Sequence, residues 1–314
     1  MKVYHIGIDQ AEELTENITA CIGYFDGLHL GHQKLIEAVK KRAEETKTVP
    51  SLITFEPDPW KVIKKIEHIP HITPMKKRME IAEQLGIQNW IVLNFTKEMA
   101  DLSIQDFHQY VLGKLNLHTL VCGYDFHYAI KGSGSVETLK AQTKFQVQVI
   151  DEVESEHQKI SSTRIEHLIL NGEMEKAAKI MGRAYEINGH VIEGNHIGRT
   201  VGFPTANLCM DDHYLIPKQG VYVGEVFCRG KWYPAFMNVG HNPSFNYQEQ
   251  TSLEAHIFDF HEMIYQESVI FRFLSFIREE CKFPGKEAFM KQLHSDMETA
   301  KNYFKSREEP ISCV

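Results

Sequence analysis

The sequence lacks an excess of basic residues, paired cysteines and long apolar runs. Its 34 Lys and Arg residues are outnumbered by 42 Asp and Glu residues, and the net charge of -8 argues against a broad surface for nucleic acid or anionic membrane. The six cysteines form no CxxC pair, so their spacing suggests neither a zinc site nor a disulfide framework. Reduced thiols are the simplest interpretation, and no nucleic-acid partner is expected.

Targeting signals are also missing. Residues 1–9 contain no apolar core of a signal peptide, and no stretch reaches the length of a membrane span. We therefore expect a soluble, cytoplasmic protein without a membrane partner. The 314 residues and 43% hydrophobic content are enough for one large domain or two ordinary ones, and two are expected. The oligomeric state is left open.

The first half of the chain alternates short apolar runs with helix-period segments, which is typical of βα units around a parallel sheet. Strands are predicted at 19–22, 51–55, 90–95, 119–122 and 145–150, and helices at 33–42, at 75–85 and after Ser103. The helix at 33–42 has one apolar and one charged face, so it should pack on the sheet. The predicted N-terminal domain, 1–182, is α/β, doubly wound and Rossmann-like.

The second half shows a different pattern. Two helices are predicted at 165–170 and 173–181, and antiparallel strand signals follow from Ala184 onward. The predicted strands lie at 221–228, 232–239, 252–258 and 268–274, and Arg229 with Gly230 forms the turn of a hairpin. The predicted C-terminal domain, 183–314, is a small antiparallel β-barrel. A helix from about Lys286 closes the chain, with an apolar stripe of Phe289, Leu293, Met297, Ala300 and Phe304.

The first candidate site is a loop with Gly23, Gly27 and Gly31 between a predicted strand and a predicted helix. Free backbone N–H groups at such a helix start favour phosphate. His29 and His32 are three residues apart, so both imidazoles can face one anion and stabilise charge on a transferred phosphoryl group. For two of 17 histidines in isolation, an incidental surface position would be the better interpretation. The strand–loop–helix setting reverses that preference.

The second candidate site is the segment 194–207, which contains three glycines, Gly194, Gly198 and Gly202, together with Pro204. Glycines in a shaped loop can admit phosphate to the backbone, although an ordinary barrel turn would be the better interpretation without other support. Thr205 and Asn207 offer neutral oxygens that suit Mg²⁺. Further on, strand alternation puts Glu254 and His256 on one face, where an isolated Glu would usually be a solvated carboxylate.

These motifs carry a family resemblance. His29-Leu30-Gly31-His32 resembles the HxGH signature of the nucleotidyltransferase superfamily, whose members attack the α-phosphate of a nucleotide and expel pyrophosphate. A narrower resemblance, to bacterial bifunctional riboflavin kinase/FAD synthetases, is carried by GYFDGLHLGHQ at 23–33, TFEPDP at 54–59, GYDF at 123–126, ISSTR at 160–164 and GRTVGFPTAN at 198–207. It spans roughly residues 18–304.

The resemblance implies that riboflavin, FMN and ATP are substrates, that Mg²⁺ accompanies ATP, and that FMN and FAD are products. In the N-terminal domain it implies catalytic His29, His32 and Arg164, flavin-binding Asp125 and Phe126, and ATP-binding Gly23, Phe25, Asp26, Gly27, Gly31, Ser162 and Thr163. Ser162 and Thr163 would bond phosphate, although an N-cap of the following helix is an open second role for this segment.

In the C-terminal domain the resemblance implies that Glu254 takes the proton of the ribityl 5′-hydroxyl as that oxygen attacks the γ-phosphate of ATP. It assigns ATP to Gly194, Gly198, Arg199, Gly202 and Pro204, magnesium to Thr205 and Asn207, and the isoalloxazine to Arg278 and Phe283.

The chain departs from the family pattern at two places in the N-terminal domain. Asp58 stands where the family often has histidine, and His127-Tyr128-Ala129 stands where it often has Arg-Phe-Gly. The alternatives to a bifunctional enzyme are therefore an enzyme that keeps only the kinase activity, or a flavin-sensing regulator without turnover. The net charge and the presence of both Glu254 and HxGH weigh against the regulator.

Overall fold

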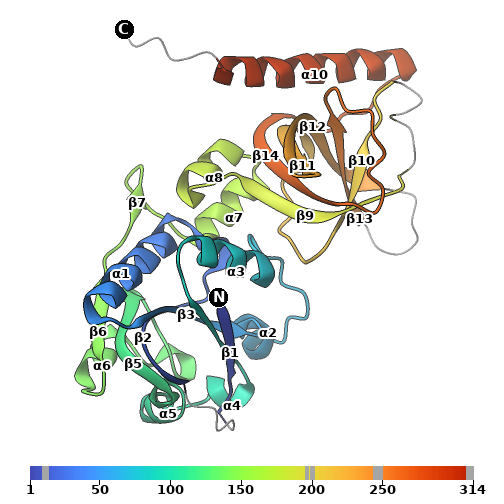
Figure 1. Ribbon diagram of the computed structural model, residues 1–314. Coiled ribbons are helices and arrows are strands. Elements are labelled where there is room, and N and C mark those ends of the chain that lie inside the picture. The colour runs from blue at the N-terminus through green and yellow to red at the C-terminus, as the bar shows by residue number, and fades with distance from the viewer. Residues whose placement is uncertain (9–13, 195–197, 199–201, 243–249, 309–314) are drawn as a thin grey trace. The chain divides into compact units, whose positions relative to one another are not determined.

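The computed structural model describes residues 1–8, 14–194, 198, 202–242 and 250–308 (Figure 1). The chain divides into two compact units, Met1–Ser162 and Thr163–Val314. The division falls before the boundary predicted between residues 182 and 183. Helix α7 (Ser162–Leu170) begins at the division, and helix α8 (Met174–Met181) contacts strands β9 (Tyr185–Ile192) and β14 (Ser268–Arg278).

The first unit is built on a six-stranded parallel sheet of order β1-β4-β3-β2-β5-β6. The strands are β1 (Lys2–Ile6), β2 (Leu14–Ile22), β3 (Val49–Glu56), β4 (Asn89–Asn94), β5 (Leu115–Gly123) and β6 (Gln146–Ile150). The five predicted strands are confirmed. Strand β1 was not predicted, because this short edge strand buries only Ile6.

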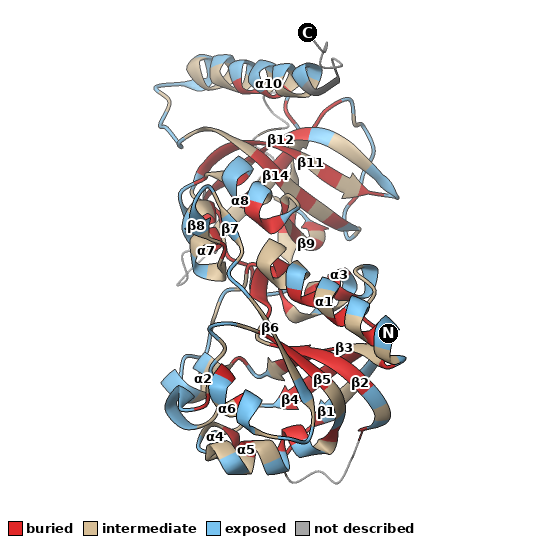
Figure 2. Ribbon diagram, turned by 90° about the vertical axis from the view of Figure 1, so that its left-hand side faces the viewer, coloured by how far each residue is buried: buried red, intermediate tan, exposed pale blue. Residues whose placement is uncertain are grey.

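Helices cover both faces of this sheet (Figure 2). Helices α1 (Leu30–Thr46) and α3 (Met75–Gln84) pack on the face of Leu52, Trp90 and Val121. Helices α4 (Lys97–Ala100), α5 (Ile104–Tyr110) and α6 (Val136–Ala141) pack on the opposite face, beside Ile53 and Ile91. Successive strand residues point to opposite faces, so two apolar layers form and the doubly wound prediction is confirmed.

The order of the strands indicates where the first unit would bind a ligand. From β2 the chain proceeds outward through β3 and β4, whereas β5 and β6 lie on the other side of β2. The carboxyl ends of β2 and β5 therefore flank a topological switch point, where open α/β sheets bind ligands. Short elements complete the unit: η1 (Asp26–Leu28), α2 (Pro59–Lys64), η2 (Leu112–Lys114), η3 (Ile130–Gly132), β7 (Glu154–Ser155) and β8 (Gln158–Lys159).

The second unit contains the closed barrel that the sequence predicts. Its order is β10-β13-β12-β11-β14-β9, with β10 (Ala206–Met210), β11 (Gly220–Cys228), β12 (Lys231–Asn242) and β13 (Gln250–Ile257). Every pairing is antiparallel. Arg229 (φ 47°) and Gly230 (φ 81°) form the tight hairpin turn, as their left-handed backbone favours.

Helix α10 (Lys286–Glu308) packs against this barrel through the predicted stripe. Phe289, Leu293 and Met297 join an apolar cluster with barrel residues Val221 and Phe236. The cluster buries the apolar side of an otherwise charged helix. Among the described residues, no helix combines the length and apolar character needed to span a bilayer.

Two candidate active sites

The first site begins with a strained turn after β2. Phe25 and Leu28 adopt positive φ values of 60° and 37°, and Gly27 has a φ of 79°. Non-glycine residues occupy this region only when surrounding structure holds them there, and such strain clusters at functional sites. The turn delivers the chain directly to the N-terminus of α1.

His29 and His32 meet at that N-terminus. The Nδ1 atom of His29 accepts a hydrogen bond of 3.3 Å from the backbone N–H of His32, so His29 is the N-cap of α1. The two rings stack with centroids 3.6 Å apart and planes 17° apart. Because Nδ1 of His29 is an acceptor, its Nε2 carries the proton of the neutral ring and can donate to an anion.

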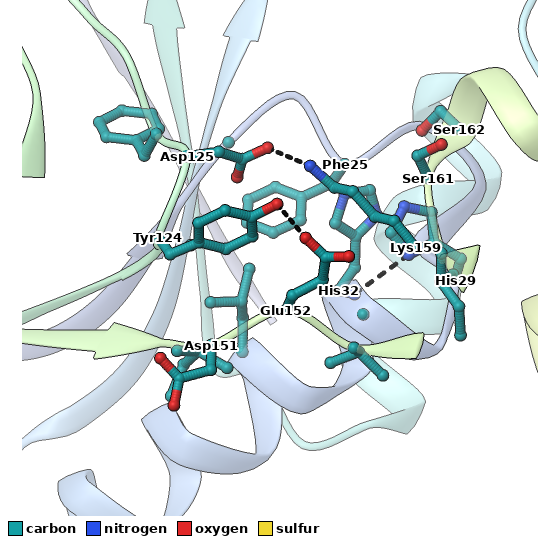
Figure 3. A pocket seen from close by; sticks show the side chains of 18 of the residues that line it. Phe25, His29, His32, Tyr124, Asp125, Asp151, Glu152, Lys159, Ser161 and Ser162 are labelled. Carbon is teal, nitrogen blue, oxygen red and sulfur yellow. Dashed lines mark hydrogen bonds and ion pairs between the residues drawn. The ribbon is translucent and has the colours of Figure 1, made fainter. Parts of the chain in front are cut away.

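These histidines line a cavity of about 310 Å³ at the carboxyl ends of the strands (Figure 3). The predicted residues Gly23, Phe25, His29, Gly31, His32, Asp125, Phe126 and Ser162 all border it. Phe126 stacks on Tyr128 with ring centroids 5.9 Å apart. The structure thus brings three separate motifs to the switch point of the sheet.

The carboxylate of Asp26 binds backbone N–H groups in this structure. Its carboxylate is 7% exposed and accepts hydrogen bonds from the backbone N–H groups of Gly27 (2.8 Å), Ile72 (3.1 Å) and Thr73 (2.8 Å). Neither Asp26 nor Gly27 borders the cavity. The carboxylate of Asp26 therefore stabilises the loop by accepting hydrogen bonds from its own backbone and from residues 72–73.

Lys159 borders the cavity although no motif pointed to it. Its Nζ pairs with the Asp125 carboxylate and lies 5.0 Å from the ring centroid of Tyr124, whose hydroxyl donates to Glu152 (Figure 3). The hydrogen bond to Asp125 raises the pKa of Lys159. A cation at this edge suits phosphate groups. Its position immediately before the ISSTR motif was the only available signal.

The departures from the family pattern have partners in the structure. Nδ1 of His127 lies 3.2 Å from the carbonyl of Gly134, and the Tyr128 hydroxyl bonds Nε2 of His108 at 2.6 Å and Oγ1 of Thr138 at 2.8 Å. The loop after Phe126 is therefore anchored through Tyr128.

The second site lies in the barrel and centres on Glu254. The hydroxyl of Thr205 donates to Oε2 of Glu254 at 3.1 Å, and Asn207 stands opposite Glu254 in the pairing of β10 with β13. Burial raises the pKa of Glu254, the Thr205 hydrogen bond lowers it, and the charge of Glu280 raises it further. A half-buried carboxylate with a raised pKa is suited to accept a proton.

Two cavities meet at Thr205. One has about 310 Å³ and is lined by aromatic residues, Arg278 and Glu254, and the other has about 80 Å³ between Pro204 and an apolar wall. Thr205 borders both cavities. The larger is lined by Gly198, Phe203, Thr205, Val221, Phe236, Asn238, Glu254, His256, Arg278, Glu280, Cys281, Phe283, Phe289 and Leu293. Thr205 is thus part of the wall of both cavities.

His256 holds the loop that leads to Thr205. Its Nδ1 donates to the Pro204 carbonyl at 2.9 Å, since a carbonyl can only accept, and its ring packs 5.1 Å from that of Phe203. Burial lowers the pKa of His256, which favours the neutral ring.

Comparisons with known proteins identify the family of this chain. A family model described as FAD synthetase matches residues 11–164, and one described as riboflavin kinase matches residues 181–304. A bifunctional riboflavin kinase/FMN adenylyltransferase from Listeria monocytogenes is 35% identical over 93% of this chain and 94% of its own. The protein of that name from Bacillus subtilis is 36% identical with the same coverage. The chain belongs to the bifunctional riboflavin kinase/FMN adenylyltransferase family.

A solved structure shares the fold over nearly the whole chain. It is titled as a macrolide-efflux protein from Streptococcus pneumoniae and aligns with a TM-score of 0.89 at 32% identity, covering 96% of this chain and 99% of that chain. Both family models name enzymes. The chain is therefore an enzyme with a FAD synthetase domain and a riboflavin kinase domain, and the single-activity and regulatory alternatives are not favoured.

Several residues predicted from the family lie elsewhere than in the cavities. Thr163 and Arg164 occupy the first turn of α7 in the second unit and do not border the first cavity, so their phosphate contacts remain predictions. Ser162 donates its hydroxyl to the Asp26 carbonyl at 2.9 Å. Arg199 lies outside the described residues.

In the riboflavin kinase domain, Gly194 and Gly198 lie so close to neighbouring residues that a side chain would clash. A Cβ at Gly194 would lie 2.3 Å from Nδ2 of Asn207, and one at Gly198 would lie 2.2 Å from the Phe203 carbonyl oxygen. Gly202 has a φ of 84°. Two of these glycines thus allow the close packing that places Asn207 and Phe203.

The guanidinium of Arg278 forms an ion pair with Asp296 on α10. Its Nε and Nη2 donate to the Asp296 carboxylate at 2.9 and 2.6 Å, and Asp296 is only 1% exposed. Phe283 lines the cavity beside Phe289, with ring centroids 5.2 Å apart. The sequence predicted flavin contact for Arg278. The structure shows that its charge is paired with the helix, which leaves the rest of the side chain to border the cavity.

Proposed function

We propose that the two sites divide the two reactions of the family between them. The cavity of His29 and His32 transfers the adenylyl group of ATP to FMN, and the cavities that meet at Thr205 transfer the γ-phosphoryl group of ATP to riboflavin. The observation that carries the second assignment is the 3.1 Å hydrogen bond between Thr205 and Glu254 at the junction of two cavities.

In the kinase reaction, riboflavin occupies the larger cavity and ATP approaches through the smaller one. The larger volume lies at the lower end of the range typical of ligand pockets, and its aromatic lining suits a flavin ring. Glu254 accepts the proton of the ribityl 5′-hydroxyl, the oxygen bonds the γ-phosphorus, and ADP leaves with the electrons of the broken P–O bond. FMN is the product.

The residues around Thr205 fit a hard cation. Thr205 and Asn207, two residues apart, supply neutral oxygens. Glu254, which hydrogen bonds Thr205 and stands opposite Asn207, supplies negative charge. We propose that they hold Mg²⁺ delivered with ATP, which would neutralise charge on the phosphates. Thr205 therefore serves two purposes, since its hydroxyl hydrogen bonds Glu254 while its oxygen faces the phosphates.

In the adenylylation reaction, the FMN phosphate attacks the α-phosphorus of ATP and pyrophosphate leaves with the bridging oxygen. His29 and His32 at the N-terminus of α1 donate N–H groups to the phosphate oxygens as charge develops. Lys159 adds a positive charge at the rim, and Phe126 supplies a ring for stacking on flavin or adenine. Arg164 is proposed to act on the same phosphates.

A product assay with two variants tests this division. Purified protein is given riboflavin and ATP, or FMN and ATP, with magnesium, and products are separated by chromatography. We expect Glu254→Gln to lose FMN formation while FMN is still converted to FAD, and His29→Ala to show the reverse. Loss of both activities in either folded variant would contradict the assignment. The cytoplasm remains the predicted location, which cell fractionation would test.

A further inference from the structure

The most unusual buried charge in the first unit is Arg78 on α3. It is 1% exposed, yet no carboxylate within ion-pair distance of it is recorded among the described residues. Its Nε has no hydrogen-bond partner among the residues that the structure describes. Burying a guanidinium in this way opposes stability, since an apolar side chain of similar size would cost less. Such a residue needs a functional explanation.

The bonds that Arg78 does make all lead to the loop of the first site. Its Nη1 donates to the backbone carbonyl of Tyr24 at 2.6 Å, and the guanidinium lies 4.6 Å from the ring centroid of Tyr24. The buried hydroxyl of Thr54 on β3 donates to the same carbonyl at 3.2 Å. Two donors therefore fix the peptide that enters the strained turn at Phe25.

Asp26, on the other side of Phe25, is bound by residues that directly precede α3. The backbone N–H groups of Ile72 and Thr73, which precede α3, bind the carboxylate of Asp26. His71 lies 3.8 Å from that carboxylate and 3.4 Å from the Tyr24 hydroxyl. Residues 71–78 thus bind the carbonyl of Tyr24 and the carboxylate of Asp26, on either side of Phe25, whose φ of 60° requires such support.

We propose that Arg78 is a positioning residue for FMN adenylylation, which holds the turn at 24–28 so that His29 and His32 present their rings to ATP. Being buried, it acts through Tyr24 and not by touching substrate. The inference rests on the assignment of the His29 cavity to adenylylation. Asp58, the N-cap of α2, is 6% exposed and acts on the same side chain: burial raises the pKa of Tyr24, and Asp58 raises it further.

The test compares Arg78→Met with Arg78→Lys and with Lys76→Met, a control at an exposed position of the same helix. FAD formation from FMN is measured for each, and riboflavin phosphorylation by the same preparation reports the concentration of active protein. We expect Arg78→Met to lower kcat for FAD formation about 100-fold, because displacing reacting groups by about 1 Å can have that effect. Arg78→Lys keeps a cationic donor for the Tyr24 carbonyl and should recover most of the rate.

A second variant keeps the proposal testable if Arg78→Met does not fold. Thr54→Val removes the other donor to the Tyr24 carbonyl without a change in volume or charge. We expect a loss in kcat for FAD formation of about fivefold, as for one net hydrogen bond, with the kinase rate unchanged. Unchanged kcat in folded Arg78→Met, or in Thr54→Val where Arg78→Met is unfolded, overturns the proposal.

The same series separates this proposal from the site assignment. If His29→Ala leaves FAD formation intact, the assignment of the cavity fails. If His29→Ala abolishes it while the Arg78 and Thr54 variants keep full activity, only the positioning role of Arg78 fails.

Discussion

Gly31 lies against the ring of His29, so that a Cβ at this position would stand 3.1 Å from both Cε1 and Nδ1 of the imidazole. His29 is fixed by its N-cap hydrogen bond and by stacking on His32, and it has little room to retreat because it is 5% exposed. The glycine is therefore part of how the adenylylation site holds its histidine.

We expect Gly31→Ala to lower kcat for FAD formation at least tenfold, because the added methyl displaces the His29 ring from its position. Helix propensity alone would favour the alanine, so a loss of rate with equal or higher thermal stability would identify the cause as positional. Gly285→Ala is the matched control, since a Cβ there meets nothing within 4 Å. Equal FAD formation by both variants would contradict the prediction.

The acid limb of the kinase pH profile should follow Glu254. A protonated Glu254 cannot accept the proton of the hydroxyl, so activity falls as the pH drops through its pKa. Burial raises that pKa, which places the limb above the pH at which an ordinary glutamate titrates. The pH dependence of kcat/KM for riboflavin, measured across the acid range, would locate it, because this ratio reports the pKa of the free enzyme.

Two neighbours should move this limb in opposite directions. Glu280→Gln removes a like charge that raises the pKa of Glu254, so the limb should shift to lower pH. Thr205→Val removes a hydrogen bond that lowers the pKa, so the limb should shift to higher pH, together with a lower maximum rate. Glu279→Gln is the control for the first change, because Glu279 pairs with Lys218 and does not border the cavity. Shifts in the same direction would exclude this account of the base.

The tyrosine that departs from the family pattern should stabilise the first unit. Tyr128→Phe removes the hydroxyl that bonds His108 and Thr138, and we expect the free energy of unfolding to fall by about 1 kcal/mol. The KM for FMN should rise, because these hydroxyl bonds fix the ring on which Phe126 stacks. Urea unfolding and FMN titrations would measure both effects. Tyr110→Phe, at a side chain 43% exposed, should change neither.

Much of the architecture could be predicted because it depends on local patterns. The short apolar runs of β2 to β5 reflect burial on both faces of the sheet, and the apolar stripe of α10 reflects burial on one side of the helix. The edge strand β1 escaped prediction because it has one buried residue and therefore almost no pattern.

The candidate sites were predictable where a motif contains the chemistry and its backbone together. His29, Gly31 and His32 lie within one turn of helix, so their spacing already determined their contact. Arg78 and Lys159 were not found, since each reaches its site through tertiary packing that has no sequence signature. The ATP contact of Asp26 stays a prediction, because a loop carboxylate that binds backbone N–H groups looks, in sequence, like one that awaits a ligand.

The ion pair between Arg278 and Asp296 offers a final prediction about the kinase domain. The Asp296 side chain is 1% exposed and that of Arg278 is 21% exposed, so the two charges do not lose equal hydration. Among the described residues, removing the arginine leaves the buried carboxylate with one side-chain partner, Gln292, at 2.8 Å, whereas removing the aspartate leaves a guanidinium that still reaches water. Arg278→Met should therefore destabilise the domain more than Asp296→Asn does, by up to about 3 kcal/mol.

Both changes should also raise the KM for riboflavin, because the pair fastens α10 beside a cavity that Phe289 and Leu293 of this helix help to line. Adenylylation of FMN by the same proteins should be unaffected, since its site lies in the other unit. Glu298→Gln is the control, because its exposed pair with Lys301 on the same helix should contribute less than about 1 kcal/mol. If Asp296→Asn proved the more damaging change, the buried carboxylate would not be the group that requires its partner, and this account of the ion pair would be wrong.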